Sequence, residues 1–278
     1  MTRGAGKFVA GSSIEIINPE IPRGTVKFAI FDFDGTISLI REGWQQIMIP
    51  MMVEILMETP DREPRSELEK VVRDFVSKTT GKQTIYQMIQ LAEEVSRRGG
   101  TPREALEYKH RYHDLLMERI THRIEKLKSG KIKPEELAVP GSLGCLREIT
   151  QRGVKCFLAS GTDEVYVLEE AELLGVTGYF EGIYGALDDY QNFSKKMVIE
   201  RILRENELKG SELIAFGDGY VEVENTKQAG GLAVGVATNE AERTGIDKWK
   251  RERLIESGAD VIMPDFLDYE ILMGFLEI

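Results

Sequence analysis

Residues 26–36, VKFAIFDFDGT, join a short apolar run to two aspartates that are separated by one residue. A continuous apolar run such as 28–31 is typical of a strand that is buried on both faces of a parallel sheet. Such a strand would deliver Asp32 and Asp34 into the turn that follows it. Two neighbouring carboxylates concentrate negative charge, which a shared proton or a cation can offset. The pattern therefore predicts a chemical site whose natural occupant is a hard divalent metal.

Two later apolar runs also end in polar residues. Residues 154–159 precede Ser160, and residues 213–216 precede Asp218 after one glycine. Parallel strands present their carboxyl ends at one edge of the sheet, where open α/β folds bind ligands. We therefore expect the residues that follow these strands to converge.

Further strands are expected at 232–236 and 259–263, and helices at 164–174 and 196–206. The alternation of strands and helices predicts the α/β class, with a Rossmann-like doubly wound parallel sheet. Residues 14–17 fit either an added strand or a loosely attached arm.

Between residues 38 and 139 the apolar residues follow helical spacing, and we find no strand pattern. One expected stripe contains Trp44, Ile47, Met48, Met51 and Met52, and another contains Leu106, His110, His113, Met117 and Ile120. The expected division is a catalytic α/β core, 1–38 and 139–278, and an all-helical domain, 39–138.

Composition excludes several classes of partner. The chain has 278 residues and a formal net charge of −11, which argues against nucleic acids and acidic membranes. Cys145 and Cys156 are too few for a secreted disulfide scaffold, and we expect both to be reduced and buried. No apolar run approaches the roughly 20 residues that span a bilayer, and the amino terminus is unlike a signal peptide. The expected location is cytoplasmic, and the sequence indicates no particular oligomeric state.

Four motifs follow one another in the order of a known family. Residues 32–36, Ser160-Gly161, Lys195 and residues 217–222 resemble the motifs of the haloacid dehalogenase-like hydrolase superfamily. The chain looks like a phosphatase-type member, and the resemblance covers about 25–38 and 139–278. The helical insert is similar in position to the helical cap that follows the first motif in many relatives.

The resemblance implies a role for each motif. Asp32 would attack phosphorus, while Lys195, Ser160 and Gly161 would hold the phosphoryl oxygens. Mg²⁺ would bind Asp32, the main-chain carbonyl of Asp34, and Asp218. The chemistry agrees, because a carboxylate with the ordinary pKa near 4 is already ionised at neutral pH, and Mg²⁺ prefers oxygen ligands.

Asp34 points to the hydrolysis of an ester, because it could protonate the leaving oxygen and then accept a proton from water. In the dehalogenase and ion-pump branches of the family the equivalent residue is not aspartate. The family's last motif commonly ends in aspartate, whereas this chain has Glu222, which we expect to act on the metal through water. Lys195 is preferred to Lys196, because apolar residues then follow at helical offsets of three, four and seven.

Two residues have further candidate roles. Ser160 also suits the N-cap of the following helix. Arg41, just after the first motif, is a candidate for binding an anionic group of the substrate.

We therefore predict an Mg²⁺-dependent phosphatase that hydrolyses a small phosphorylated metabolite, such as a sugar phosphate or a phosphoglycolate-like acid, through an aspartyl-phosphate. The alternatives are a phosphosugar mutase with the same intermediate and a catalytically silent binding protein.

Overall fold

The computed structural model describes residues 6–190 and 194–278, and the chain divides into two compact units. The first unit consists of Met1–Glu42 and Lys126–Ile278, and the second of Gly43–Glu125.

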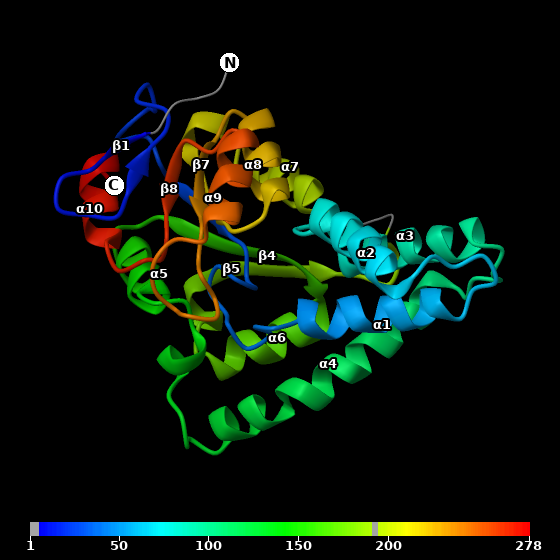
Figure 1. Cartoon of the computed structure of the whole chain (residues 1–278). Coiled ribbons are helices and arrows are strands. Elements are labelled where there is room, and N and C mark those ends of the chain that lie inside the picture. The colour runs from blue at the N-terminus through cyan, green and yellow to red at the C-terminus, as the bar shows by residue number, and fades with distance from the viewer. Residues whose placement is uncertain (1–5, 191–193) are drawn as a thin grey trace. The chain divides into compact units, whose positions relative to one another are not determined.

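The described part of the first unit contains one eight-stranded sheet with the spatial order β1-β2-β8-β7-β6-β3-β4-β5 (Figure 1). Six neighbouring strands, from β8 to β5, are parallel, whereas β1 and β2 are antiparallel at one edge. The strands are β1 (Lys7–Phe8), β2 (Glu15–Ile16), β3 (Phe28–Phe31), β4 (Lys155–Asp163), β5 (Phe180–Ala186), β6 (Leu213–Gly217), β7 (Leu232–Val236) and β8 (Val261–Met263).

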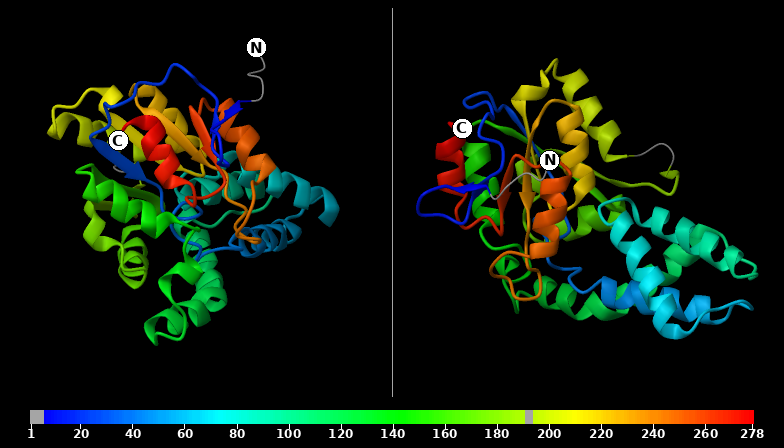
Figure 2. Two further views of the ribbon diagram at one scale, coloured as in Figure 1. Left: turned by 90° about the vertical axis from the view of Figure 1, so that its left-hand side faces the viewer. Right: turned by 45° about the horizontal axis from the view of Figure 1, so that its top comes forward.

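Helices cover the sheet (Figures 1 and 2). Helices α7, α8 and α9 contact one another in series, and α5 contacts α10. The helices of this unit are α5 (Ser142–Gln151), α6 (Glu164–Leu173), α7 (Lys195–Glu205), α8 (Tyr220–Gln228), α9 (Lys248–Glu256) and α10 (Tyr269–Leu276), with short 3-10 turns at Pro134–Leu137, Thr177–Tyr179 and Gly210–Glu212. This arrangement confirms the predicted Rossmann-like α/β fold.

Both faces of the central strands are buried, as their uninterrupted apolar sequences predict. Phe31 of β3 stacks on Phe216 of β6 with ring centroids 4.6 Å apart. The alternate residues Phe28 and Ile30 belong to a second buried cluster, which includes Val198 of α7. Burial on both faces fixes the register of β3, so the chain that leaves this strand starts from a rigid platform.

The sequence interpretation missed β5, and it did not decide whether residues 14–17 form a strand. Strand β5 contains Gly182 and Gly185, and most of its residues are only partly buried, so it lacks the apolar run of the central strands. Residues 14–17 contribute β2, which pairs antiparallel with β8.

The second unit, Gly43–Glu125, is built of helices and contains α1 (Gln45–Met57), α2 (Arg65–Thr79), α3 (Thr84–Arg97) and most of α4 (Ala105–Lys128). The predicted stripe on α4 was only partly right. Ile120 is buried, but His110 is exposed, whereas Tyr108, Tyr112 and Leu116 are buried. The two tyrosines carry the apolar face, and the pattern of aliphatic residues alone did not reveal them. That this unit acts as a cap stays a prediction, as does the division into a core of 1–38 and 139–278 with a cap of 39–138.

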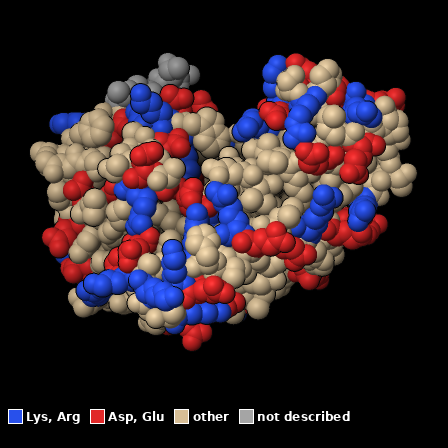
Figure 3. Space-filling view, turned by 60° about the horizontal axis from the view of Figure 1, so that its bottom comes forward, with Lys and Arg blue, Asp and Glu red and all other residues tan. Residues whose placement is uncertain are grey.

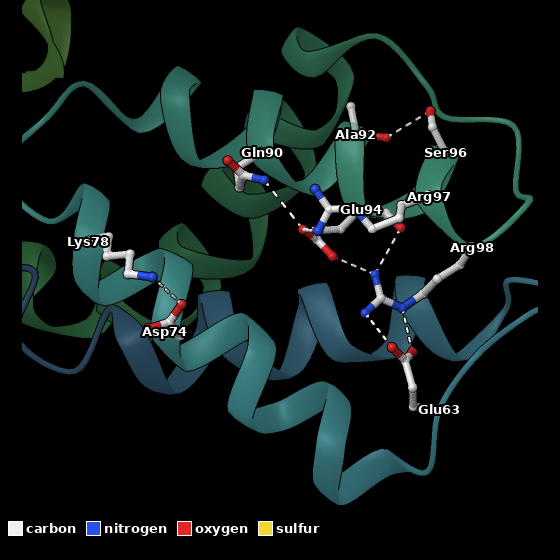
Figure 4. Close-up of polar contacts among 9 residues, drawn as sticks. All are labelled: Glu63, Asp74, Lys78, Gln90, Ala92, Glu94, Ser96, Arg97 and Arg98. Atoms are coloured by element: carbon white, nitrogen blue, oxygen red, sulfur yellow. Dashed lines mark hydrogen bonds and ion pairs between the residues drawn. The ribbon is translucent and has the colours of Figure 1, made fainter.

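An ionic cluster with a buried centre, Arg98 and Glu94, lies at the carboxyl end of α3 (Figure 4). Arg98 contacts Glu63 through Nε and Nη2 at 2.6 and 2.9 Å, and its Nη1 contacts Glu94 Oε2 at 2.5 Å. Arg97 also contacts Glu94, at 2.6 Å. The cluster ties the loop before α2 to α3.

Within the described ranges, no helix has both the length and the apolar character needed to cross a membrane. On the face drawn in Figure 3, basic side chains are interspersed with acidic ones.

Candidate active site

The turn after β3 is held against β6. The N–H of Asp32 donates to the carbonyl of Phe216 at 2.9 Å, and the N–H of Asp218 donates to Thr36 Oγ1 at 3.0 Å. Gly35 adopts a φ of +74°, and a Cβ at this position would lie 2.3 Å from Asp218 Oδ2. Only glycine combines this left-handed backbone with such a close approach, so Asp218 packs directly on the first motif.

Asp32 forms a buried ion pair with Lys195, the first residue of α7. Lys195 Nζ lies 2.8 Å from Asp32 Oδ1, and both side chains are less than a tenth exposed. The same ammonium binds Glu222 Oε1, from the first turn of α8. Lys196 instead projects outward with its side chain 55% exposed. The structure thus brings Lys195, rather than Lys196, to the aspartates.

Asp34 contacts the end of β4. Thr162 Oγ1 donates to Asp34 Oδ2 at 2.8 Å, and Ser160 Oγ lies 3.5 Å from the same oxygen. The pairing of β4 with β5 is irregular between Ala159 and Asp163, and the hydroxyls of Ser160 and Thr162, on either side of Gly161, both lie at the same oxygen of Asp34. The interpretation of Ser160 as an N-cap is wrong, because β4 continues to Asp163, which occupies the N-cap position of α6.

Arg41 lies on the other side of Asp34. Its Nε is 4.0 Å from Asp34 Oδ1, and its Nε and Nη2 lie 2.9 and 2.7 Å from Glu170 Oε1. Glu170 is a buried residue of α6. Arg41 belongs to the same compact unit as Asp34, and this ion pair holds its guanidinium. Its role in binding a substrate anion stays a prediction.

Asp218 is paired with a lysine from the carboxyl-terminal part of the chain. Lys250 Nζ lies 2.6 Å from Asp218 Oδ2 and 2.6 Å from Glu240 Oε1. Lys250 is in the first turn of α9, and Glu240 lies in the loop between β7 and α9.

The three contacts follow one pattern, in which a cation lies between a central aspartate and an outer glutamate. The three sets together contain six acids and three cations, so when all are ionised the negative charge is twice the positive charge. The sets are Asp32, Lys195 and Glu222; Asp34, Arg41 and Glu170; and Asp218, Lys250 and Glu240.

This excess of negative charge suits a hard cation such as Mg²⁺. Two observations on the described residues bear on the fit. They contain no group of three His, Cys, Asp or Glu side chains arranged to hold a metal ion. The implied ligand set, however, needs only two side chains, Asp32 and Asp218, with the main-chain carbonyl of Asp34 as the third ligand. The close packing of Asp218 on Gly35 sets this second carboxylate beside the first motif.

Burial changes the acidity of both aspartates of the first motif. Loss of solvent raises the pKa of Asp32 to about 6, against the opposing effect of Lys195 and with a further increase from Asp218. Loss of solvent also raises the pKa of Asp34 to about 6, where Arg41 opposes the shift and Glu170 adds to it. The pKa of Asp32 therefore lies above the ordinary value near 4 from which its ionisation at neutral pH was inferred. At pH 7 about nine-tenths of a group with a pKa of 6 is still ionised.

Sequence reasoning missed several members of this site. Thr162 contacts Asp34 from the irregular end of β4, which a regular strand pattern does not predict. Glu170, Glu240 and Lys250 carry no motif, and only the fold brings them to the aspartates. Glu222 Oε1 contacts Lys195 directly, and the action of Glu222 on a metal through water stays a prediction. The catalytic and metal-binding roles of the motif residues stay predictions.

The acidic cluster lies at the carboxyl ends of β3, β4 and β6, the switch point of a Rossmann-like sheet, where α/β proteins bind ligands. The model of the haloacid dehalogenase-like hydrolase family matches residues 26–230. The chain belongs to this family, as its motifs predicted.

Solved structures share the fold at low sequence identity. A predicted phosphoglycolate phosphatase from Haemophilus somnus has a TM-score of 0.60 and 14% identity, covering 90% of this chain and 98% of its own. A β-phosphoglucomutase from Clostridium difficile has a TM-score of 0.60 and 12% identity, covering 91% and 97%. A predicted phosphatase from Clostridium acetobutylicum has a TM-score of 0.57 and 19% identity, covering 92% and 100%. No curated protein sequence matches the chain.

Proposed function

We propose that the protein is an Mg²⁺-dependent phosphatase that hydrolyses a small phosphomonoester through an aspartyl-phosphate on Asp32. The observation that carries this proposal is the buried pair of Asp32 and Lys195, with Asp34 two residues along the chain and paired with Thr162. Membership of a hydrolase family and the fold shared with phosphatases support it.

In the proposed first step, Asp32 forms a bond to phosphorus while the bond from phosphorus to the ester oxygen breaks. Both described contacts of the Asp32 carboxylate, from Phe33 N–H and from the Lys195 ammonium, fall on Oδ1. We therefore assign the attack to Oδ2. Bound Mg²⁺ would supply positive charge that offsets the repulsion between this carboxylate and the phosphate oxygens. Lys195 would add to that compensation from the protein side.

Asp34 would serve as the acid and then as the base. A pKa of about 6 is close to neutral pH, so the carboxyl group can give a proton to the leaving oxygen and recover one from the attacking water. That water forms a bond to phosphorus, phosphate leaves, and Asp32 regains its carboxylate. The hydrogen bond from Thr162 would orient Asp34 through both steps.

The mutase alternative rests on the same site and on the fold shared with a β-phosphoglucomutase. The two reactions differ in whether water or a sugar hydroxyl takes the phosphoryl group from Asp32. A panel of small phosphomonoesters, assayed with Mg²⁺ and with EDTA, separates them: free phosphate indicates hydrolysis, whereas an isomer without free phosphate indicates a mutase.

Asp32→Asn is the matched test of mechanism, because the amide keeps the shape of the side chain but is a poor nucleophile. We expect loss of turnover in a folded protein. Phosphate release that persists in Asp32→Asn would overturn the aspartyl-phosphate. Inactivity of the wild type over the whole panel would favour the silent binding protein.

A further inference from the structure

Lys250 is buried between two carboxylates and contacts a different aspartate of the site from Lys195. Its side chain is 11% exposed, and its Nζ is 2.6 Å from both Asp218 Oδ2 and Glu240 Oε1. Two carboxylates at ion-pair distance stabilise the charged form of the amine, so the pair geometry holds Lys250 as an ammonium. The ammonium is therefore a fixed positive charge on Asp218.

The protein holds Lys250 firmly. Asp247 caps α9 by accepting the N–H of Lys250 itself at 3.0 Å. The next residue, Arg251, forms two contacts with Glu15 of β2, at 2.7 and 2.6 Å. Helix α9 thus begins at a point fixed by its own cap and by the strand pair at the sheet edge.

The partner loop is tied down as well. Arg243, three residues after Glu240, donates to the main-chain carbonyls of Glu135, Glu136 and Ala138. Both ends of the contact between Lys250 and Glu240 are therefore anchored to the first unit.

Asp218 has little freedom to turn away from Lys250. Its carboxylate packs on Gly35, and its N–H is bound to Thr36. A divalent cation that binds Asp218 approaches a carboxylate whose Oδ2 is already paired with an ammonium, and two positive charges on one carboxylate repel each other. Glu240 offers that ammonium a second carboxylate at the same distance.

We propose that Lys250 is the built-in counter-ion of the metal site: it neutralises Asp218 in the metal-free protein and is retained by Glu240 when a divalent cation binds Asp218. The inference rests on the proposed metal-dependent function and goes beyond it. Lys250 stabilises the metal-free fold and weakens the affinity for Mg²⁺, so it sets the concentration at which the site fills. It acts as a positioning residue through Asp218.

The test measures Mg²⁺ binding to EDTA-stripped full-length protein by calorimetry at constant ionic strength. We expect Lys250→Met to bind Mg²⁺ at least about tenfold more tightly, because Asp218 and Glu240 lose their counter-ion. We expect Glu240→Gln to bind at least about threefold more weakly, because Lys250 is left with Asp218 alone. Lys248→Met removes the same charge from an exposed position of α9 and should stay within about twofold of the wild type.

Thermal unfolding gives a second readout that does not depend on turnover. The increase in Tm on adding Mg²⁺ should be larger in Lys250→Met than in the wild type, because the metal-free variant is destabilised and its metal site binds more tightly. If Lys250→Met does not fold without metal, Lys250→Gln keeps a polar hydrogen-bond donor without the charge and serves for both measurements.

Two outcomes overturn the proposal in different ways. If the wild type binds Mg²⁺ and the neutral variants at Lys250 bind with the affinity of Lys248→Met or more weakly, Lys250 is not the counter-ion, and the proposed function is unaffected. If the wild type binds no Mg²⁺ at millimolar concentration, both the metal dependence and this inference fail.

Discussion

The Lys195 ammonium lies 2.8 Å from Asp32 Oδ1 and also binds Glu222, so one buried cation joins the candidate nucleophile to the last motif. The lysine is held in place by two carboxylates at once. Removing it leaves two carboxylates that are less than a tenth exposed without their shared counter-ion, which is costly in a desolvated site.

Lys195→Met should lower kcat/KM by at least about 10³-fold, or ~4 kcal/mol, because the substituted side chain cannot offset charge on Asp32 or on the phosphate. Lys196→Met is the matched control, since Lys196 is the next residue and contacts only Glu200 at 3.9 Å among the ion pairs described. The control should retain at least half of the activity. Equal losses in the two variants, measured by phosphate release, would contradict the assignment of Lys195.

The choice between these two lysines could be made from the sequence, because helical spacing places Val198, Ile199 and Ile202 on the buried face of α7, and Lys195 shares that face. The strands that carry Asp32 and Asp218 could be predicted for a similar reason: each is a continuous apolar run that is buried on both faces.

The outer acids could not be predicted in this way. Glu170 lies on a helix whose sequence shows little segregation of polar residues, and Glu240 lies in a loop. Their roles depend on tertiary packing that brings segments far apart in the sequence to the same carboxylates. Local sequence patterns carry no information about such contacts. Strand β5 was missed for a related reason, because an edge strand with glycines has no buried apolar run.

Glu170→Gln should shift the pH dependence of the reaction. The negative charge of Glu170 raises the pKa of Asp34, and Arg41 lowers it. Without that charge the pKa of Asp34 falls, so Asp34 loses its proton at a lower pH. The alkaline limb of kcat/KM, which reports the protonated acid, should move to lower pH.

Glu169→Gln is the control for this shift, because Glu169 is the preceding residue of α6 but is half exposed and pairs with Lys128. Its profile should match that of the wild type. A profile of Glu170→Gln that moves to higher pH, or does not move, would show that Glu170 does not act on Asp34.

Asp34→Asn should stabilise the metal-free protein at neutral pH. The folded-state pKa of Asp34, about 6, lies above its ordinary value of 3.8, so folding favours the protonated form. The contribution of Asp34 to stability is therefore full below about pH 4 and is lost as the pH rises through 6. Asparagine does not titrate, and its side-chain carbonyl can still accept the hydrogen bond from Thr162.

The gain in the free energy of unfolding should be about 1–3 kcal/mol at pH 7.5 and smaller at pH 4.5, as measured by urea unfolding in EDTA. A gain that is larger at pH 4.5 than at pH 7.5 would reverse the sign of this argument.

Arg98→Met should destabilise the helical unit. Arg98 is 5% exposed and joins Glu63 to Glu94 (Figure 4), and Glu94 is itself buried. Methionine fills a similar volume but leaves Glu94 with Arg97 and Gln90 as its described polar side-chain partners. Because a buried carboxylate then loses its main counter-ion, the free energy of unfolding should fall by about 2–4 kcal/mol. Lys78→Met removes an exposed i,i+4 ion pair with Asp74, which should change stability by less than about 0.5 kcal/mol. Hydrogen exchange of the α3 amides measures the difference locally. Protection should fall in Arg98→Met and stay unchanged in Lys78→Met. Equal protection in the two variants would mean that the cluster around Arg98 adds no more stability than a surface ion pair.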